Sequence, residues 1–183
     1  MKIKSNAAPQ ELNSPFYQKN QEFCQTFEKF VASKNGLVKG KFNAWSYLIY
    51  GKITANYDWD LKYKRAIYSS TGSIFSLLYR NEVVLTLAEW ICNDIDTNDT
   101  SFFIRKKKFL DRLNPKFSQA KNHKYVITSK GKSSIFASQI IQILAPLFES
   151  EEIFKIRLKN GKLIIELRSE TAHLDVLDEL LLV

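Results

Sequence analysis

The residues best suited to chemistry in this 183-residue chain are the lysines and arginines between Phe103 and Lys132. That window holds ten basic residues and a single acid, Asp111, whereas the rest of the chain has 17 basic residues against 18 acidic ones. The positive excess of the whole protein therefore comes from one stretch of thirty residues. Clustered lysines and arginines bind phosphates, carboxylates or anionic surfaces.

We predict that this stretch forms a basic face of a non-enzymatic interaction module, which binds an acidic protein or an anionic membrane surface. The predicted binding residues are Arg105, Lys106, Lys107, Lys108, Arg112, Lys116, Lys121 and Lys124. A second interpretation is that the lysines only keep a connecting segment in contact with water, as charged runs commonly do.

Nucleic-acid binding through the same segment is the alternative function. Aromatic residues such as Phe103, Phe109 and Phe117 lie between the cations, a pattern suited to a phosphate track with stacking platforms. Three features weigh against this alternative. Lysine outnumbers arginine, Phe109 and Phe117 have the spacing of core residues, and no RNP, helix-turn-helix or zinc-finger pattern is present.

Few residues could carry out catalysis. His123 lies among lysines and is predicted to be a solvated loop residue, and His173 lies near the start of a predicted helix. Asp58 and Asp60 share one face of a predicted strand, where two carboxylates could split their pKa values. Because Lys62 continues that face, ordinary charge pairing is the preferred interpretation. Without a Gly-rich phosphate loop or a nucleophile motif, we predict that the protein is not an enzyme and has no cofactor.

The acidic stretch from Cys92 to Thr100 resembles a calcium-binding loop only in its spaced aspartates. An EF-hand loop needs Gly at its sixth position and Glu at its twelfth, but counting from Asp94 these positions hold Asp99 and Arg105. We therefore predict no metal site.

Composition places the chain among globular proteins, with 45% hydrophobic residues and only six glycines. No stretch approaches the ~18 apolar residues that span a bilayer, and the N-terminus lacks the apolar run of a secretory signal. We predict a cytoplasmic protein, which the basic segment could also hold at the membrane surface. Cys24 and Cys92 have neither CxxC nor metal-type spacing, so two reduced thiols are preferred over one disulfide.

The N-terminal part is predicted to begin with a flexible polar tail over residues 1–13. Ser14-Pro15 is typical of a helix start, and Asn35-Gly36 of a helix end. The apolar stripe between them is Phe16, Phe23, Phe27, Phe30 and Val31. It has the spacing of a helix face that packs on a core.

Period-two patterns then predict antiparallel strands. The predicted strands are Leu48–Asn56, Trp59–Tyr68, Ile74–Tyr79 and Val83–Trp90. The turns between them are predicted at Asn56–Asp58, Ser69–Ser73 and Arg80-Asn81. A helix over Ile74–Ile91 is the alternative to the last two strands, because the apolar residues there are nearly continuous.

The C-terminal part is predicted to contain a short helix at Lys107–Leu113, a strand at Tyr125–Thr128 and a turn at Lys130–Lys132. A helix follows near 133–148, and Pro146 should kink or shorten it. Asn160-Gly161 between alternating runs predicts a hairpin of Ile153–Lys159 and Lys162–Arg168, with Phe154, Ile156 and Leu158 on its inner face. Leu174–Leu182 should form a short final helix. The predicted fold is therefore α+β, with an antiparallel sheet in a single domain over residues 14–183.

Three segments of the C-terminal half, FFIRKKKFLDRLNPKF, KYVI and FKIRLKNGKLIIE, occur in that order with a helix before the last. In this arrangement the chain resembles the closing half of an uncharacterised bacterial family of domains of unknown function. The resemblance implies a bacterial source and an apolar-basic strand that precedes a helix and a terminal hairpin. It implies no activity and brings no catalytic motif. Many members carry N-terminal apolar helices that look like membrane anchors, which this chain lacks.

Overall fold

The computed structural model describes residues 2–74, 77–95, 101–107, 111, 124–130 and 135–183. The helices of these residues are α1 (Pro15–Ser33), α3 (Ile135–Ile143), α4 (Ala145–Glu149) and α5 (Leu174–Leu180), with one 3-10 turn, η1 (Pro9–Glu11). The strands are β1 (Ile3–Ser5), β2 (Leu37–Phe42), β3 (Ser46–Thr54), β4 (Asp58–Ile74), β5 (Leu77–Asn93), β6 (Ser101–Lys106), β7 (Tyr125–Lys130), β8 (Ile153–Lys159) and β9 (Lys162–Leu167).

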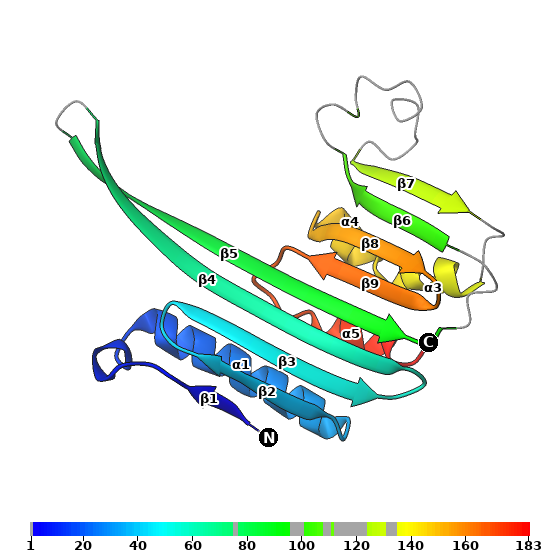
Figure 1. Ribbon diagram of the computed structural model, residues 1–183, viewed down its shortest axis with the longest axis horizontal. Helices are drawn as coiled ribbons and strands as arrows, with labels where there is room; N and C mark the ends of the chain where they lie inside the picture. Colours follow the sequence, from blue (N-terminus) through cyan, green and yellow to red (C-terminus); the bar gives the residue numbers. More distant parts are fainter. Residues whose placement is uncertain (1, 75–76, 96–100, 108–110, 112–123, 131–134) are drawn as a thin grey trace. The chain divides into compact units, whose positions relative to one another are not determined.

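The described strands form one mostly antiparallel sheet in the order β1-β2-β3-β4-β5-β9-β8-β6-β7 (Figure 1). With the four α-helices, this sheet confirms the predicted α+β class. The chain groups into two compact units. The first comprises residues 1–53, 60–88 and 169–172, and the second 54–59, 89–168 and 173–183. The single domain over residues 14–183 stays a prediction.

Helix α1 of the first unit begins and ends as its sequence predicts. The Ser14 hydroxyl accepts a hydrogen bond from the Phe16 N–H at 3.3 Å, Pro15 occupies the first turn, and Asn35 adopts a left-handed backbone with φ of 54°. The buried line of the helix is Tyr17, Asn20, Cys24, Phe27 and Val31. Phe27 and Val31 also belong to the predicted stripe. The other predicted members, Phe16, Phe23 and Phe30, lie next to buried positions and are only half-buried.

The buried line of α1 packs on β2, β3 and β4. Phe27 meets the Tyr63 ring edge-on at a centroid distance of 5.0 Å. Gly51 on β3 allows this close approach, because a Cβ there would lie 2.8 Å from Cζ of Phe27. The buried Asn20 is satisfied, since its Nδ2 donates to the carbonyls of Asn43 at 2.8 Å and Ala44 at 3.2 Å.

Strand β1 lies where the sequence predicted a flexible tail. Its residues pair in parallel with β2, from Ile3 opposite Gly40 to Ser5 opposite Phe42. Contacts with α1 add to this pairing, because Ile3 N–H donates to Oε2 of Glu28 at 3.4 Å. A short polar segment therefore becomes a strand through main-chain pairing, which the periodicity of three residues cannot indicate.

Two long strands replace the three shorter ones predicted between Trp59 and Trp90. Strand β4 runs without interruption through the predicted turn at Ser69–Ser73, and β5 runs through Arg80-Asn81. Both predicted turns are therefore wrong, whereas the preference for strands over a helix at Ile74–Ile91 is confirmed. The two strands are neighbours in the sheet, and their pairing overrides the turn preferences of Ser, Gly and Asn.

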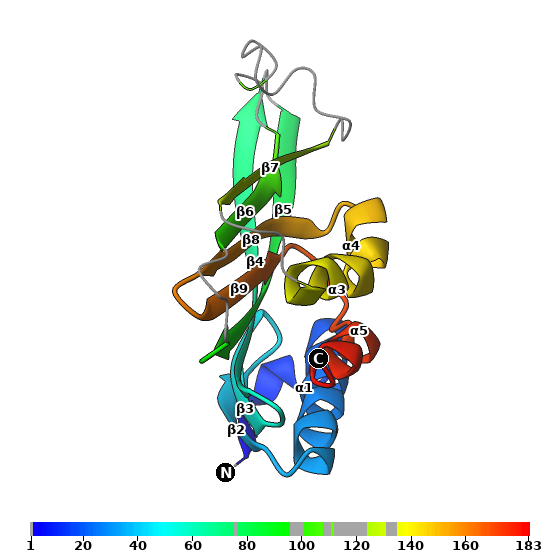
Figure 2. The same ribbon diagram turned by 90° about the vertical axis from the view of Figure 1, so that its right-hand side faces the viewer.

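The second unit has α3, α4 and α5 on one face of its strands (Figure 2). On this face Ile104, Ile156 and Ile165 are fully buried, at 0% exposure. Tyr125 on β7 meets the ring of Phe148 on α4 edge-on at 5.0 Å. Helix α3 ends at Ile143 and α4 begins at Ala145, so the interruption predicted from Pro146 is confirmed.

The C-terminal hairpin turns at the predicted Asn160-Gly161, where both residues have positive φ, 51° and 71°. One part of its predicted alternation is wrong. Ile156 and Leu158 are buried, but a register shift between Ile153 and Lys155 makes a β-bulge that leaves Phe154 41% exposed. The predicted helix at Lys107–Leu113 and the turn at Lys130–Lys132 lie largely outside the described residues.

The bulge can be tested with two aspartate substitutions. Leu158→Asp places a charge without a partner at a site that is 1% exposed, and we expect the free energy of unfolding to fall by about 3 kcal/mol or more. Phe154→Asp is the matched control, and its cost should stay within about 1 kcal/mol because the bulge exposes that position. Urea denaturation measures both values. Equal losses at the two positions would contradict the bulge.

Candidate functional site

The predicted basic face is only partly within the described structure. Lys108, Arg112, Lys116 and Lys121 lie outside the described residues. Arg105 is paired: its two terminal nitrogens lie 2.5 and 2.8 Å from the two carboxylate oxygens of Asp111, which is 9% exposed. Hydrogen bonding to this carboxylate raises the pKa of Arg105. Arg105 and Asp111 therefore form a bidentate ion pair, the geometry that arginine commonly adopts with carboxylates.

Two further cations of the predicted face converge on Glu151, in the connection between α4 and β8. Lys124 Nζ lies 2.7 Å from Oε1 of Glu151, and Lys106 Nζ lies 3.9 Å from Oε2. The hydrogen bond from Lys124 lowers the pKa of the Glu151 carboxyl. A main-chain hydrogen bond joins the same two segments, because Lys107 N–H donates to the Lys124 carbonyl at 2.9 Å. Arg105, Lys106 and Lys124 thus form ion pairs with Asp111 and Glu151 of the same chain.

A second set of cations lies on the sheet face opposite α3 and α4. Register places Phe103 on β6 between Thr128 on β7 and Arg157 on β8, and Arg157 opposite Ile164 on β9. Phe103 and Ile164 are half-buried, whereas Thr128 and Arg157 are exposed. This cross-strand row therefore combines an aromatic ring, a hydroxyl and a guanidinium on one open surface.

More cations extend this surface toward the hairpin turn. Lys159 pairs in register with Lys162, and both are exposed. No carboxylate of the described residues pairs with Arg157, Lys159 or Lys162. Lys155 differs, since its Nζ lies 2.5 Å from Oε1 of Glu166. We call the set Phe103, Thr128, Arg157, Lys159 and Lys162 the basic sheet face.

A shallow hollow of about 280 Å³ opens on the basic sheet face. Its lining consists of Ser101, Phe102, Phe103, Thr128, Ser129, Arg157, Leu158 and Lys159. By strand alternation, the lining side chains that belong to this face are Ser101, Phe103, Thr128, Arg157 and Lys159, which supply two hydroxyls, one aromatic ring and two cations. Such a depression can hold an apolar group while cations at its rim meet carboxylates or phosphates.

The sequence did not indicate Arg157 and Lys159 as candidate binding residues, because their alternation placed them on the solvated side of a hairpin. The alternation of Lys155, Arg157 and Lys159 with buried residues did indicate that they share one face. What was missing was the pairing of β6 with β8, which brings Phe103 next to Arg157 across 54 positions of sequence. No local pattern indicates such a pairing.

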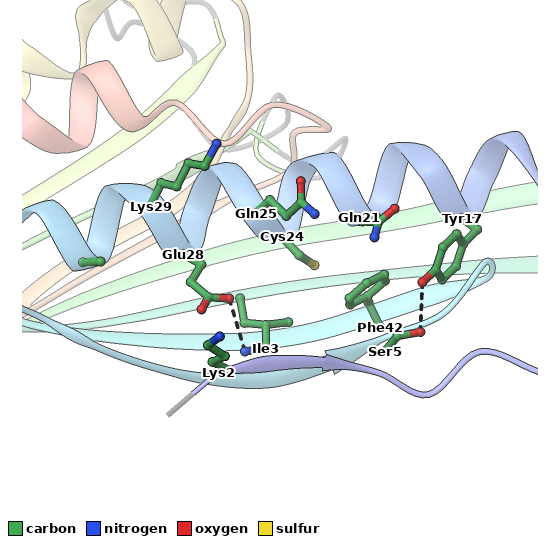
Figure 3. A pocket seen from close by; sticks show the side chains of 11 residues that line it. Lys2, Ile3, Ser5, Tyr17, Gln21, Cys24, Gln25, Glu28, Lys29 and Phe42 are labelled. Carbon is green, nitrogen blue, oxygen red and sulfur yellow. Dashed lines mark hydrogen bonds between the residues drawn. The ribbon is translucent and has the colours of Figure 1, made fainter. Parts of the chain in front are cut away.

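The first unit contains a larger groove of about 530 Å³ between α1 and β1 (Figure 3). Its polar groups connect the two elements: Tyr17 OH donates to Oγ of Ser5 at 3.2 Å, and Glu28 accepts from Ile3 N–H. Cys24, which is 2% exposed, lies against the groove as a neutral thiol, since burial raises its pKa to about 12. These contacts hold β1 on α1 and bring no catalytic pair together.

Asp58 and His173, two of the other candidate residues, have structural partners. Asp58 accepts a hydrogen bond from the Thr54 hydroxyl at 2.7 Å across the connection between β3 and β4. His173 begins α5, with its Nε2 at 3.1 Å from Oε2 of Glu152. His123 lies outside the described residues. Among the residues that the structure describes, none gather in a group of three that could hold a metal.

Comparison of the chain with protein-family models, with curated proteins and with solved structures finds no match. The resemblance to an uncharacterised bacterial family therefore stays a prediction. Of the helices in the described residues, none is long and apolar enough to cross a membrane.

Both cysteines should be unreactive thiols in the folded protein. Burial raises the pKa of Cys24 and of Cys92 to about 12, so both stay protonated near neutral pH. We expect alkylation by iodoacetamide to be slow in the native protein and complete in urea. Intact mass without reductant checks their state, and a loss of two hydrogens would show a disulfide instead.

The pKa of Glu151 should rise in the variant Lys124→Gln, which removes the hydrogen bond that lowers it. Lys106→Gln should give a smaller rise, because its Nζ lies farther away, at 3.9 Å. An NMR titration of the carboxyl signal measures both shifts. The lowered pKa also means that the pair stabilises the fold at neutral pH and loses this effect as the pH falls through that pKa. An unchanged pKa in Lys124→Gln would show that the pair does not form in solution.

Proposed function

We propose that this protein is a binding module that recognises an acidic segment of another protein through the basic sheet face. One observation carries the proposal: Phe103 lies beside the hollow between Thr128 and Arg157, on a surface whose exposed cations have no carboxylate partner among the described residues. A surface whose cations have no carboxylate partner among the described residues is complementary to a segment that carries carboxylates.

The charge distribution supports an anionic partner. The chain carries a formal net charge of +8, and the acids Asp111 and Glu151 already pair with cations of the sequence cluster. Arg157, Lys159 and Lys162 remain directed to solvent from the two strands of one hairpin. Such grouped charges attract an oppositely charged segment and raise its association rate.

Single-stranded nucleic acid is the second candidate, because an aromatic ring among cations on an open antiparallel sheet can stack a base. Two observations favour the acidic protein segment. The basic sheet face, as its described residues define it, offers one aromatic ring, that of Phe103. A single strand of nucleic acid binds best where successive aromatic rings can stack successive bases. In addition, Arg105, Lys106 and Lys124 pair with carboxylates of the protein and do not form an open phosphate track.

Fluorescence anisotropy with a labelled peptide of about ten residues, alternating Glu and Val, tests the proposal. We expect the double variant Arg157→Gln and Lys159→Gln to weaken binding at least about tenfold. The matched control is Lys19→Gln with Lys41→Gln, which removes the same charge from exposed positions of the first unit. The control should change affinity by less than about threefold, because neither lysine belongs to the basic sheet face or lines its hollow.

Three further probes distinguish the candidates at about 150 mM salt: a Lys-Val peptide, an oligothymidylate of about 15 nucleotides and vesicles with anionic lipid. The Lys-Val peptide should not bind. Tighter binding of the oligonucleotide, lost in the double variant, would replace the proposal with nucleic-acid binding. Binding to vesicles but not to the Glu-Val peptide would replace it with a membrane-surface role, and binding of none of the probes would refute it.

A further inference from the structure

Strand β7 is the last strand of the sheet, and it pairs with β6 on one side. None of the described residues pairs with its other side. Three consecutive residues of this strand, Ile127, Thr128 and Ser129, are exposed. An edge strand with an exposed β-branched residue is a template for pairing with another chain, which natural sheets otherwise block with charges, prolines or bulges.

An apolar row on the helix-covered face stops at this edge. Register aligns Ile127 with Ile104, Ile104 with Ile156, and Ile156 with Ile165 across four strands. The last three are 0% exposed, but Ile127 at the end of the row is 54% exposed. One more strand beside β7 would continue the row and cover Ile127.

The two faces at this edge differ in chemistry. Ile127 belongs to the apolar face, whereas its neighbour Thr128 belongs to the basic sheet face, in one row with Phe103 and Arg157. Because successive side chains of a strand point to opposite faces, an added strand presents alternate residues to these two surfaces. The strand that fits this edge therefore has apolar residues alternating with acidic ones.

We propose that the partner's acidic segment binds as an additional strand beside Ile127, Thr128 and Ser129, on the edge of β7 with which no described residue pairs. Its apolar residues cover Ile127, and its acidic residues lie on the side of the basic sheet face. This inference rests on the proposed function and specifies how the segment binds. Main-chain hydrogen bonds to β7 supply much of the affinity, and the alternation of the side chains supplies the specificity.

The charges contribute attraction at a distance. Strands lie about 4.8 Å apart, so the added strand would be about 14 Å from β8, which carries Arg157 and Lys159. The long side chains of Glu and Arg reduce this gap to within about one Debye length at physiological salt. A second copy of this chain fits the edge less well, because antiparallel pairing of two β7 strands would place two basic sheet faces side by side.

Peptide probes test the strand pairing on the unmodified, full-length protein. In a strand, the N–H groups of alternate residues point to opposite edges, so only one set faces β7. We compare the Glu-Val peptide with two versions, one N-methylated at every Glu and the other at every Val. One version should lose at least about tenfold in affinity, and the other should stay within about threefold of the parent. Equal effects of the two patterns would overturn the inference.

The variant Ile127→Thr tests the apolar half of the pattern and keeps a β-branched residue at an exposed position. It should weaken the Glu-Val peptide several-fold and leave a Glu-Thr peptide unaffected. A peptide that binds and responds to Arg157→Gln with Lys159→Gln, but to neither Ile127→Thr nor the N-methyl pattern, would overturn the strand pairing and leave the proposed function intact. A Glu-Val peptide that does not bind at all would overturn both.

Discussion

The pairing of β6 with β8 is the constraint on which the second unit depends. It sets Ile104 against Ile156 on one face and Phe103 against Arg157 on the other. The first contact belongs to the row that α3 and α4 cover, and the second belongs to the open surface. A slip of one residue would exchange the two faces, exposing the isoleucines and burying the guanidinium. The apolar core therefore fixes the position of the basic sheet face, and burial of that core supplies the free energy that keeps this face in place.

Charge density along a sequence and positive potential on a surface are different quantities in this protein. The stretch with the most cations also contains Asp111 and lies against Glu151, and these two carboxylates engage three of its described cations. The hairpin has fewer cations, yet Arg157 and Lys159 face solvent without such partners among the described residues. Cations that already pair with carboxylates of the protein are less available to a ligand than cations that face solvent from strands.

The features that sequence predicted are local ones. The start of α1 at Ser14-Pro15, the interruption before Pro146 and the turn at Asn160-Gly161 each depend on the backbone preferences of one or two residues. The missed features depend on long-range pairing: the β6–β8 contact, the uninterrupted β4 and β5, and the bulge that exposes Phe154. Half of the predicted basic face lies outside the described residues, so the structure leaves that part of the prediction as it was.

The close approach of Phe27 to Gly51 limits which residues these two positions can hold together. A methyl group at position 51 would lie 2.8 Å from the Phe27 ring and 3.0 Å from Val31, closer than carbon atoms approach one another. A larger residue at position 51 therefore requires Phe27 to move or to be replaced by a smaller side chain. The two positions are coupled, so that an aromatic ring at 27 can lie this close to β3 only while position 51 has no side chain.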